Sequence, residues 1–221
     1  MTISNLRDVV QNCYNSGQYT ISGFRKVPAL ASAAGTWSDL TMAPGNPKPN
    51  YYTGAELTST VLDARSGLFH GESQSPKEKY LHHISIGGVA GASQAGTYLL
   101  CDFLLFYPLI DMDSTDEQLC INSTALPRYA TGDGVRAFLV ATNTYVGGQS
   151  FVVKYTDYNG TSDLYAKPHA SNLAGNIGTI VNSTITSLSN IGPFIQESSP
   201  HPGIRSVQSV QFFGPNGGLA A

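Results

Sequence analysis

The sequence predicts an all-β protein, most simply a jelly-roll-like β-sandwich with a short N-terminal helix and an extended Pro-rich arm. About eight short segments carry strand-type residues, and Gly-, Pro- or Asn-containing turns separate them. They do not alternate with helical stretches, which argues against a parallel α/β sheet. We therefore expect an N-terminal helix over 1–17 and a single β-sandwich domain over 18–221, with the arm at about 36–54.

The predicted helix covers residues 3–14. Apolar residues recur there at helical spacing and form one stripe, with Ser4 as a plausible N-cap and Asn15–Gly17 as a plausible end. Two roles are open for this stripe: packing on the sandwich of the same chain, or contact with a neighbouring subunit. Its members are Leu6, Val9, Val10 and Cys13.

The predicted strands follow in order along the rest of the chain. They are 18–24, 56–62, 80–86, 97–107, 135–142, 150–157, 161–166, 179–188 and 206–213. Segment 97–107 is apolar on both faces, which predicts a central, fully buried strand. Asn159-Gly160 predicts a type I′ turn, because that turn needs a positive φ at both central residues.

The segment 43–52 is rich in proline. Pro44, Pro47 and Pro49 favour an extended, polyproline-like path without ladder hydrogen bonds. It is either a surface loop or an arm that lies on a neighbouring subunit. For the second case, the predicted contact residues are Trp37, Met42, Tyr51 and Tyr52 together with the three prolines, because stiff segments with aromatic anchors dock at low entropic cost.

Charge is scarce in this chain. Asp, Glu, Lys and Arg make up 12% of the residues, where about 25% is typical. Surface charge normally keeps proteins apart, so we expect other subunits to cover much of the surface and the chain to form a homo-oligomer.

The net charge of −3 gives no basic footprint for nucleic acid. No apolar run reaches the length of a membrane span and no signal peptide is visible, so neither nucleic acid nor a membrane is an expected partner.

No catalytic template is complete, so we expect no enzyme, no metal and no cofactor. The loop 91–96 has one residue too many for a nucleophile elbow. His82 and His83 would point to opposite faces of a strand. The acidic stretch 111–117 departs from an EF-hand, which favours a solvated acidic turn over another kind of calcium loop. Cys101 lies in the most apolar stretch, which predicts a buried, inert thiol.

Several distinctive strings resemble virion structural proteins of tailed bacteriophages, a poorly characterised family. They are GTWSDLTMAPGNPKPNYY at 35–52, YLLCDFLLFYP at 98–108, LPRY at 126–129, GIRSV at 203–207 and GGLAA at 217–221. The family brings no established active site. Its relatives continue past the final GGLAA, so the resemblance implies that this chain is a short form.

The resemblance implies a virion protein assembled in the host cytoplasm. Its role would most simply be that of a capsid decoration or cement protein that bridges and stabilises capsid subunits, with the major capsid protein as partner. A neck, collar or tail component is the close alternative. From another class, a glycan-binding receptor module is also open, because the 12 tyrosines could stack on sugars.

Overall fold

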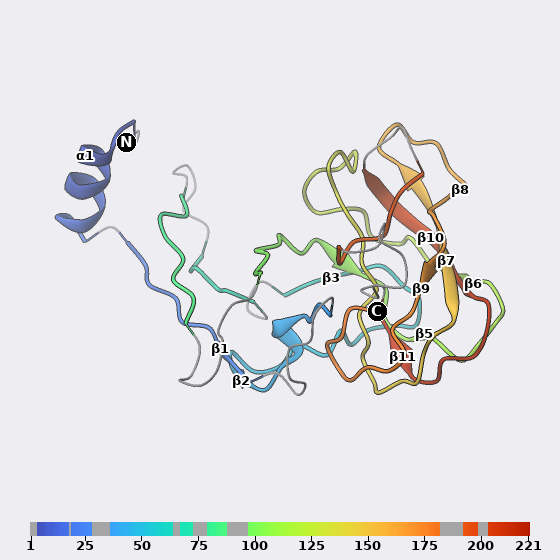
Figure 1. Ribbon diagram of the computed structural model, residues 1–221. Coiled ribbons are helices and arrows are strands. Elements are labelled where there is room, and N and C mark those ends of the chain that lie inside the picture. The colour runs from blue at the N-terminus through green and yellow to red at the C-terminus, as the bar shows by residue number, and fades with distance from the viewer. Residues whose placement is uncertain are drawn as a thin grey trace. The chain divides into compact units, whose positions relative to one another are not determined.

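The computed structural model describes residues 4–17, 19–27, 36–63, 67–72, 79–87, 97–181, 192–198 and 203–221. The described residues form strands and a single short α-helix, so the all-β prediction is confirmed at this level (Figure 1). The chain divides into two compact units. Unit 1 comprises Met1–Gly23 and Leu68–Asp102, and unit 2 comprises Phe24–Gly67 and Phe103–Ala221. Residues 68–102, expected in the sandwich, thus group with the N-terminal helix.

Unit 1 begins with helix α1, Leu6–Val9, which continues as a π-helical turn, Val10–Tyr14. The N-cap is Asn5, one residue later than predicted, and its side chain accepts a hydrogen bond from the Asp8 backbone N–H. Ser4 instead donates its own N–H and hydroxyl to the Asp8 carboxylate. The helix therefore starts where an Asx side chain satisfies a free N–H group.

Two predicted strands, 18–24 and 80–86, do not form. Their described residues, 19–24 and 80–86, pair with no other strand, so both predictions are wrong for these residues. Tyr19 and Ile21 expose 52% and 85% of their surface. None of the residues described in unit 1 is buried. Alternating apolar residues form a strand only where a neighbouring strand and a core receive them, and the described part of unit 1 offers neither.

The main sheet of unit 2 is antiparallel and has five strands. The order along the sheet is β6–β10–β7–β8, and β9 also pairs with β7. The two long strands are β7, Ser150–Asp157, and β10, Ile204–Phe212. The short ones are β6, Gln118–Leu119, β8, Leu164–Tyr165, and β9, His169–Ala170.

Both long strands were predicted from the sequence, 150–157 because Phe151, Val153 and Tyr155 share one face, and 206–213 as the last strand of the series. Phe151 pairs with Phe212 and Val153 with Val210, and all four side chains are at most 2% exposed. The prediction of 150–157 is confirmed at both ends. The prediction of 206–213 is confirmed as a strand, but β10 begins at Ile204 and ends at Phe212.

The hairpin between β7 and β8 has a three-residue loop, so the type I′ prediction is wrong. Of Asn159 and Gly160, only Gly160 has a positive φ, of 85°. The Gly160 N–H donates to Asp157 O, and the Asp157 N–H donates to Thr161 O. The Asp157 carboxylate also accepts the Thr161 N–H, at 2.8 Å, and Gly160 takes the left-handed conformation at the end of the loop.

The described part of unit 2 also contains three two-stranded ladders. They are β1, Arg25–Lys26, with β2, Gly45–Asn46; β3, Thr60–Val61, with β4, Leu105–Phe106; and β5, Ile110–Asp111, with β11, Leu219–Ala220. Segment 135–142 forms only single bridges, Val140 with Ile180 and Ala141 with Ala220. Most of the strand predicted at 179–188 lies outside the described residues.

The prediction of a fully buried strand at 97–107 is wrong. Only Leu105–Phe106 is strand, and Leu99 and Leu100 are half-exposed or more. Leu104 and Tyr107, in contrast, are buried. The segment changes from unit 1 to unit 2 after Asp102, so only its second half reaches a core.

Two apolar clusters form the core of unit 2. The larger one lies against the main sheet around Phe151, Tyr155 and Phe212. The smaller one consists of Met42, Tyr52, Val140, Ile180 and Ala221, with Trp37, Leu62, Phe106 and Phe138 packed at its edge.

Candidate interaction surfaces

The Pro-rich arm lies on its own unit. Gly45–Asn46 forms strand β2 and pairs with β1, so the predicted absence of ladder hydrogen bonds is wrong. The approach is close: a Cβ on Gly45, whose φ is 144°, would lie 2.0 Å from Arg25 O. Lys26 Nζ also donates to Thr41 O and to Ala43 O, at 3.0 Å each. Burial lowers the pKa of this Lys26 amine, and the nearby Asp39 raises it in part.

Two of the predicted contact residues are core residues. Met42 and Tyr52 expose 2% and 4% of their surface and pack in the smaller cluster. The Asp39 carboxylate accepts hydrogen bonds from the Tyr52 hydroxyl and from the Thr41 N–H and hydroxyl. These bonds turn Tyr52 inward. The two side chains therefore cannot serve as anchors on a neighbouring subunit, and their prediction as interface residues is corrected.

The other predicted contact residues of the arm differ in access. Pro44 and Tyr51 are exposed, and Trp37, Pro47 and Pro49 are partly buried. Pro44 and Tyr51 are the ones that remain open to a partner.

The predicted helix stripe is only partly covered, with Val9 and Cys13 partly buried and Leu6 and Val10 exposed. Leu6 is 73% exposed, Val10 is 43% exposed and Val9 is partly buried. The Tyr14 hydroxyl lies 3.4 Å from His82 Nδ1, and the two rings meet edge-on at 5.7 Å. These contacts attach the end of the helix to segment 79–87.

Unit 1 exposes many large apolar side chains. We call this set the unit 1 apolar surface: Leu6, Val10, Tyr19, Ile21, Tyr80, Leu81, Ile86, Leu99 and Leu100. Segments 19–23, 80–87 and 97–101 contain no Asp, Glu, Lys or Arg. Sequence reasoning assigned most of these residues to strands, of which only 97–107 was expected to be fully buried. The signal it could have used is the absence of charge from the predicted outward faces.

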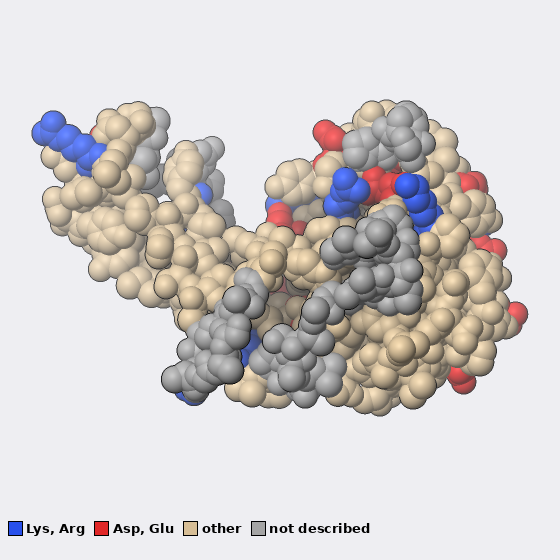
Figure 2. Space-filling view, in the orientation of Figure 1, with Lys and Arg blue, Asp and Glu red and all other residues tan. Residues whose placement is uncertain are grey.

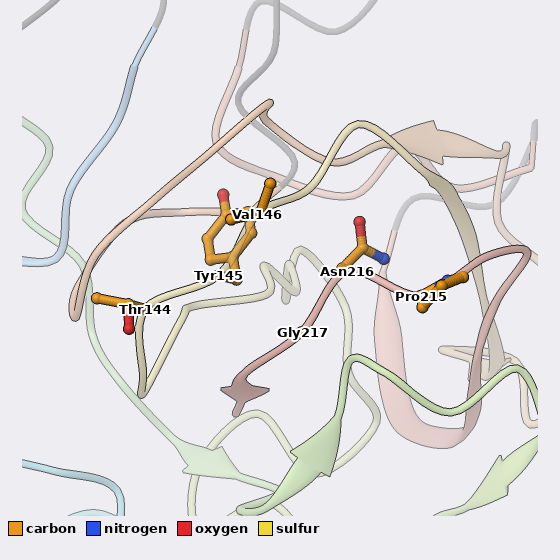
Figure 3. A pocket seen from close by; sticks show the side chains of 6 residues that line it. All are labelled: Thr144, Tyr145, Val146, Pro215, Asn216 and Gly217. Atoms are coloured by element: carbon orange, nitrogen blue, oxygen red, sulfur yellow. The ribbon is translucent and has the colours of Figure 1, made fainter.

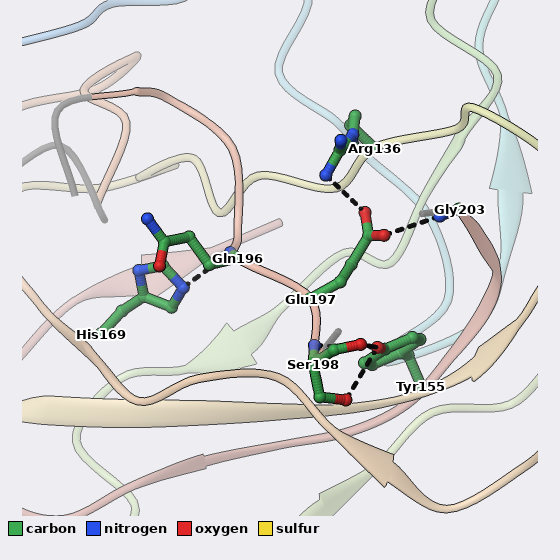
Figure 4. Close-up of polar contacts among 7 residues, drawn as sticks. All are labelled: Arg136, Tyr155, His169, Gln196, Glu197, Ser198 and Gly203. Carbon is green, nitrogen blue, oxygen red and sulfur yellow. Dashed lines mark hydrogen bonds and ion pairs between the residues drawn. The ribbon is translucent and has the colours of Figure 1, made fainter. Parts of the chain in front are cut away.

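A polar cluster joins residues 195–198 to the main sheet (Figure 4). Glu197 contacts Arg136 Nη1 at 3.0 Å with one carboxylate oxygen and accepts the Gly203 N–H at 2.6 Å with the other. The Tyr155 hydroxyl accepts the Ser198 N–H at 3.1 Å. Each of these groups is engaged in holding the chain, and they include no nucleophile paired with a base.

His169 belongs to the same cluster and is 2% exposed. Its Nε2 accepts the Gln196 N–H at 2.9 Å, so the proton of the neutral ring sits on Nδ1. Burial lowers the pKa of His169 to about 4, which keeps the ring neutral at pH 7. Nδ1 has no hydrogen-bond partner among the described residues. With Nε2 occupied as an acceptor, the ring has no free lone pair to act as a base.

A pocket of about 350 Å³ lies at the end of unit 2 that carries the C-terminal segment. Tyr145 and Asn216 lie on opposite sides of it (Figure 3), and Thr144, Val146, Pro215 and Gly217 complete the lining. Asn216 Oδ1 accepts the Ser171 hydroxyl at 2.7 Å. Tyr145 is 4% exposed, so its ring offers no open face on which a sugar could stack.

The other predicted candidates are separate from this pocket. The acidic residues bond locally: Asp111 accepts the Asp113 N–H at 2.9 Å, and Glu117 contacts Lys154 Nζ at 2.9 Å. In the described part of the chain, no group of three His, Cys, Asp or Glu residues could hold a metal ion. Cys101 is exposed, which corrects its predicted burial.

Comparison with protein-family models, with curated proteins and with solved structures found no match to this chain. Among the described residues, no helix is long and apolar enough to cross a membrane.

Proposed function

We propose that this chain is a structural protein of a bacteriophage virion, most simply a capsid decoration or cement protein built on a jelly-roll-like β-sandwich. The observation that carries the proposal is the unit 1 apolar surface. The resemblance of segments 35–52, 98–108, 126–129, 203–207 and 217–221 to virion structural proteins supports the same role.

The apolar surface favours a docking role on physical grounds. Ile21 is 85% exposed, Leu6 73% and Leu81 69%, and none of the described residues of unit 1 is buried. An accumulation of exposed apolar side chains in one part of a protein marks a candidate interaction site. Docking on a capsid would cover these side chains and would bury on the order of 1,600 Å² at a standard interface. Repetition over a shell would strengthen the attachment through avidity.

A neck, collar or tail position needs the same kind of surface, and the number of copies per particle separates it from a decoration role. A glycan-binding module is the candidate from another class. It is favoured only by exposed tyrosines such as Tyr51, Tyr129 and Tyr165, which are 54%, 59% and 55% exposed.

The unit 1 apolar surface can be tested with a pair of charge substitutions. In the variant Ile21→Asp/Leu81→Asp, two exposed side chains become charged, so we expect particle binding to weaken at least tenfold. Burial of each aliphatic side chain contributes roughly 1.5–3 kcal/mol, and about 1.4 kcal/mol corresponds to a factor of ten. Binding is measured as copies retained on particles after sedimentation.

Leu119→Asp is the matched control, because Leu119 is 66% exposed but belongs to unit 2. If the double variant binds as the control does, unit 1 is not the docking surface.

Deletion of residues 43–50 is a poorer test, because it would remove β2 and with it the ladder to β1. The exposed Tyr51 is probed more cleanly by Tyr51→Ala.

A further inference from the structure

One end of unit 2 is built from segments that are free of charged residues, and the exposed Asp113, whose carboxylate accepts the Gly217 N–H at 3.2 Å, is a charged group next to them. Segments 138–149, 170–181 and 213–221 contain no Asp, Glu, Lys or Arg. At the chain's average of 12% charged residues, segments of this combined length would be expected to carry several. We call their common surface the charge-free face.

The fold brings these three segments together. The Val146 N–H donates to Asn216 O at 2.9 Å, and the Gly147 N–H donates to Leu173 O at 2.9 Å. Ala141 bridges to Ala220. In Figure 2 the area around the place that Figure 1 labels β11 shows no blue or red, whereas charged atoms gather in the upper part and at the right-hand edge of unit 2.

Large apolar side chains stand out from the charge-free face. Leu173 is 78% exposed, Val146 76%, Phe213 58% and Ile177 42%. Val146 and Pro215 also line the pocket of about 350 Å³. Backbone hydrogen bonds hold the segments in place, so little conformational entropy would be lost if this face were covered.

We propose that the charge-free face binds the same face of a second copy of this chain, in a two-fold symmetric contact. The scarcity of charge favours this occupant. A highly charged partner would have to bury its charges against segments that offer no charged residue to pair with them, which is costly. A second copy brings a surface that is equally poor in charge. In a two-fold contact the same patch serves both subunits.

The available area fits a dimer of standard size. Four large apolar side chains, each exposing on the order of 100 Å², supply about half of the ~800 Å² that each partner typically buries. Uncharged exposed residues such as Asn143 and Thr144 surround them and can supply the polar rim. The proposal goes beyond the virion role and does not depend on it, because the purified chain tests it alone.

The test is sedimentation equilibrium of the purified full-length chain over a range of concentrations. We expect a monomer–dimer equilibrium in the unsubstituted chain. Leu173→Glu should raise its dissociation constant at least 100-fold, because two-fold symmetry brings two carboxylates into one uncharged contact. Val146→Glu should act in the same direction. The control Leu119→Glu places the same charge at a site on β6, next to the Glu117–Lys154 ion pair, and should leave the dissociation constant unchanged.

Leu173 and Val146 are more than three-quarters exposed, so their substitution should leave the urea midpoint of unfolding unchanged. A chain that stays monomeric at all concentrations would overturn the proposal. So would a dimer that both Leu173→Glu and Val146→Glu leave intact, since the contact would then lie elsewhere. A closed trimer or larger ring would overturn the two-fold arrangement.

Discussion

At the residue scale, Tyr155 shows how one buried side chain can fasten a loop to the main sheet. Its ring is fully buried in the larger cluster, while its hydroxyl accepts the Ser198 N–H at 3.1 Å. Glu197 makes two further polar contacts next to it. The path of residues 195–198 therefore depends on a few specific polar atoms rather than on a helix or strand.

Tyr155→Phe should lower the free energy of unfolding by about 1–2 kcal/mol. The ring still fills its site, but the partly buried Ser198 N–H loses its acceptor, and an unsatisfied donor costs about this much. Urea unfolding measures the change. Tyr129→Phe, at a side chain that is 59% exposed, is the control and should have little effect. Equal stability of the two variants would show that the Tyr155 hydroxyl bond contributes nothing.

The lowered pKa of the buried His169 ring should make the free energy of unfolding depend on pH. Its pKa is lowered from 6.5 to about 4 by burial, so the unfolded chain binds the proton more readily than the folded chain does. The free energy of unfolding should therefore be unaffected by this group above pH 6.5. It should fall as the pH drops from 6.5 to about 4, by up to about 3 kcal/mol.

His169→Gln is the matched variant for this effect, because its side-chain oxygen can accept the Gln196 N–H but does not titrate. Urea unfolding of both proteins at pH 7 and pH 5 measures the difference. The unsubstituted chain should lose more stability over this interval than the variant does. Equal losses would mean that His169 does not carry this pH dependence.

At the scale of elements, the β7–β8 hairpin depends on one glycine. Gly160 has a φ of 85°, and the nearest atom to an added Cβ, Arg205 Nη1, would be at an ordinary 3.5 Å. Gly160→Ala should therefore cost roughly 1 kcal/mol through backbone strain alone. Gly23→Ala is the control, since nothing lies within 4 Å of an added Cβ there and its φ is not positive. Thermal or urea unfolding that shows no difference between the two would contradict the loop geometry described above.

The success of the sequence-based predictions differs between elements for physical reasons. Strand 150–157 could be predicted because one of its faces is buried, and burial on one face imposes a period of two on the sequence. The prediction of a fully buried strand at 97–107 failed because composition does not say which neighbouring residues cover an apolar segment. The strand Leu219–Ala220 was missed because two residues carry no pattern, and only the distant Ile110–Asp111 defines it.

The same limits apply to the candidate surfaces. The exposed stripe of Leu6 and Val10 could be predicted as a possible contact, because a lone amphipathic helix leaves one apolar face to be covered. Met42 and Tyr52 were misassigned because their local context is a Pro-rich segment. Their burial depends on Asp39 and on the distant residues Val140 and Ile180.

At the scale of the whole molecule, scarcity of charge is the property that links the proposals. The chain has 12 basic and 15 acidic residues among 221, and both the unit 1 apolar surface and the charge-free face of unit 2 lack them in the segments named above. Two such surfaces on one chain allow one contact to a particle and another to a second copy. A protein that forms repeated contacts in an assembly needs one surface for the particle and one for its own copies.

The most direct test of the virion role is density-gradient fractionation of particles from a producing lysate, with each fraction probed for this chain. We predict that the chain sediments with intact particles, at tens to hundreds of copies per particle for a decoration protein and at fewer copies for a neck or tail component. A chain that stays at the top of the gradient as free protein would contradict the virion role, and the glycan-binding alternative would then come first.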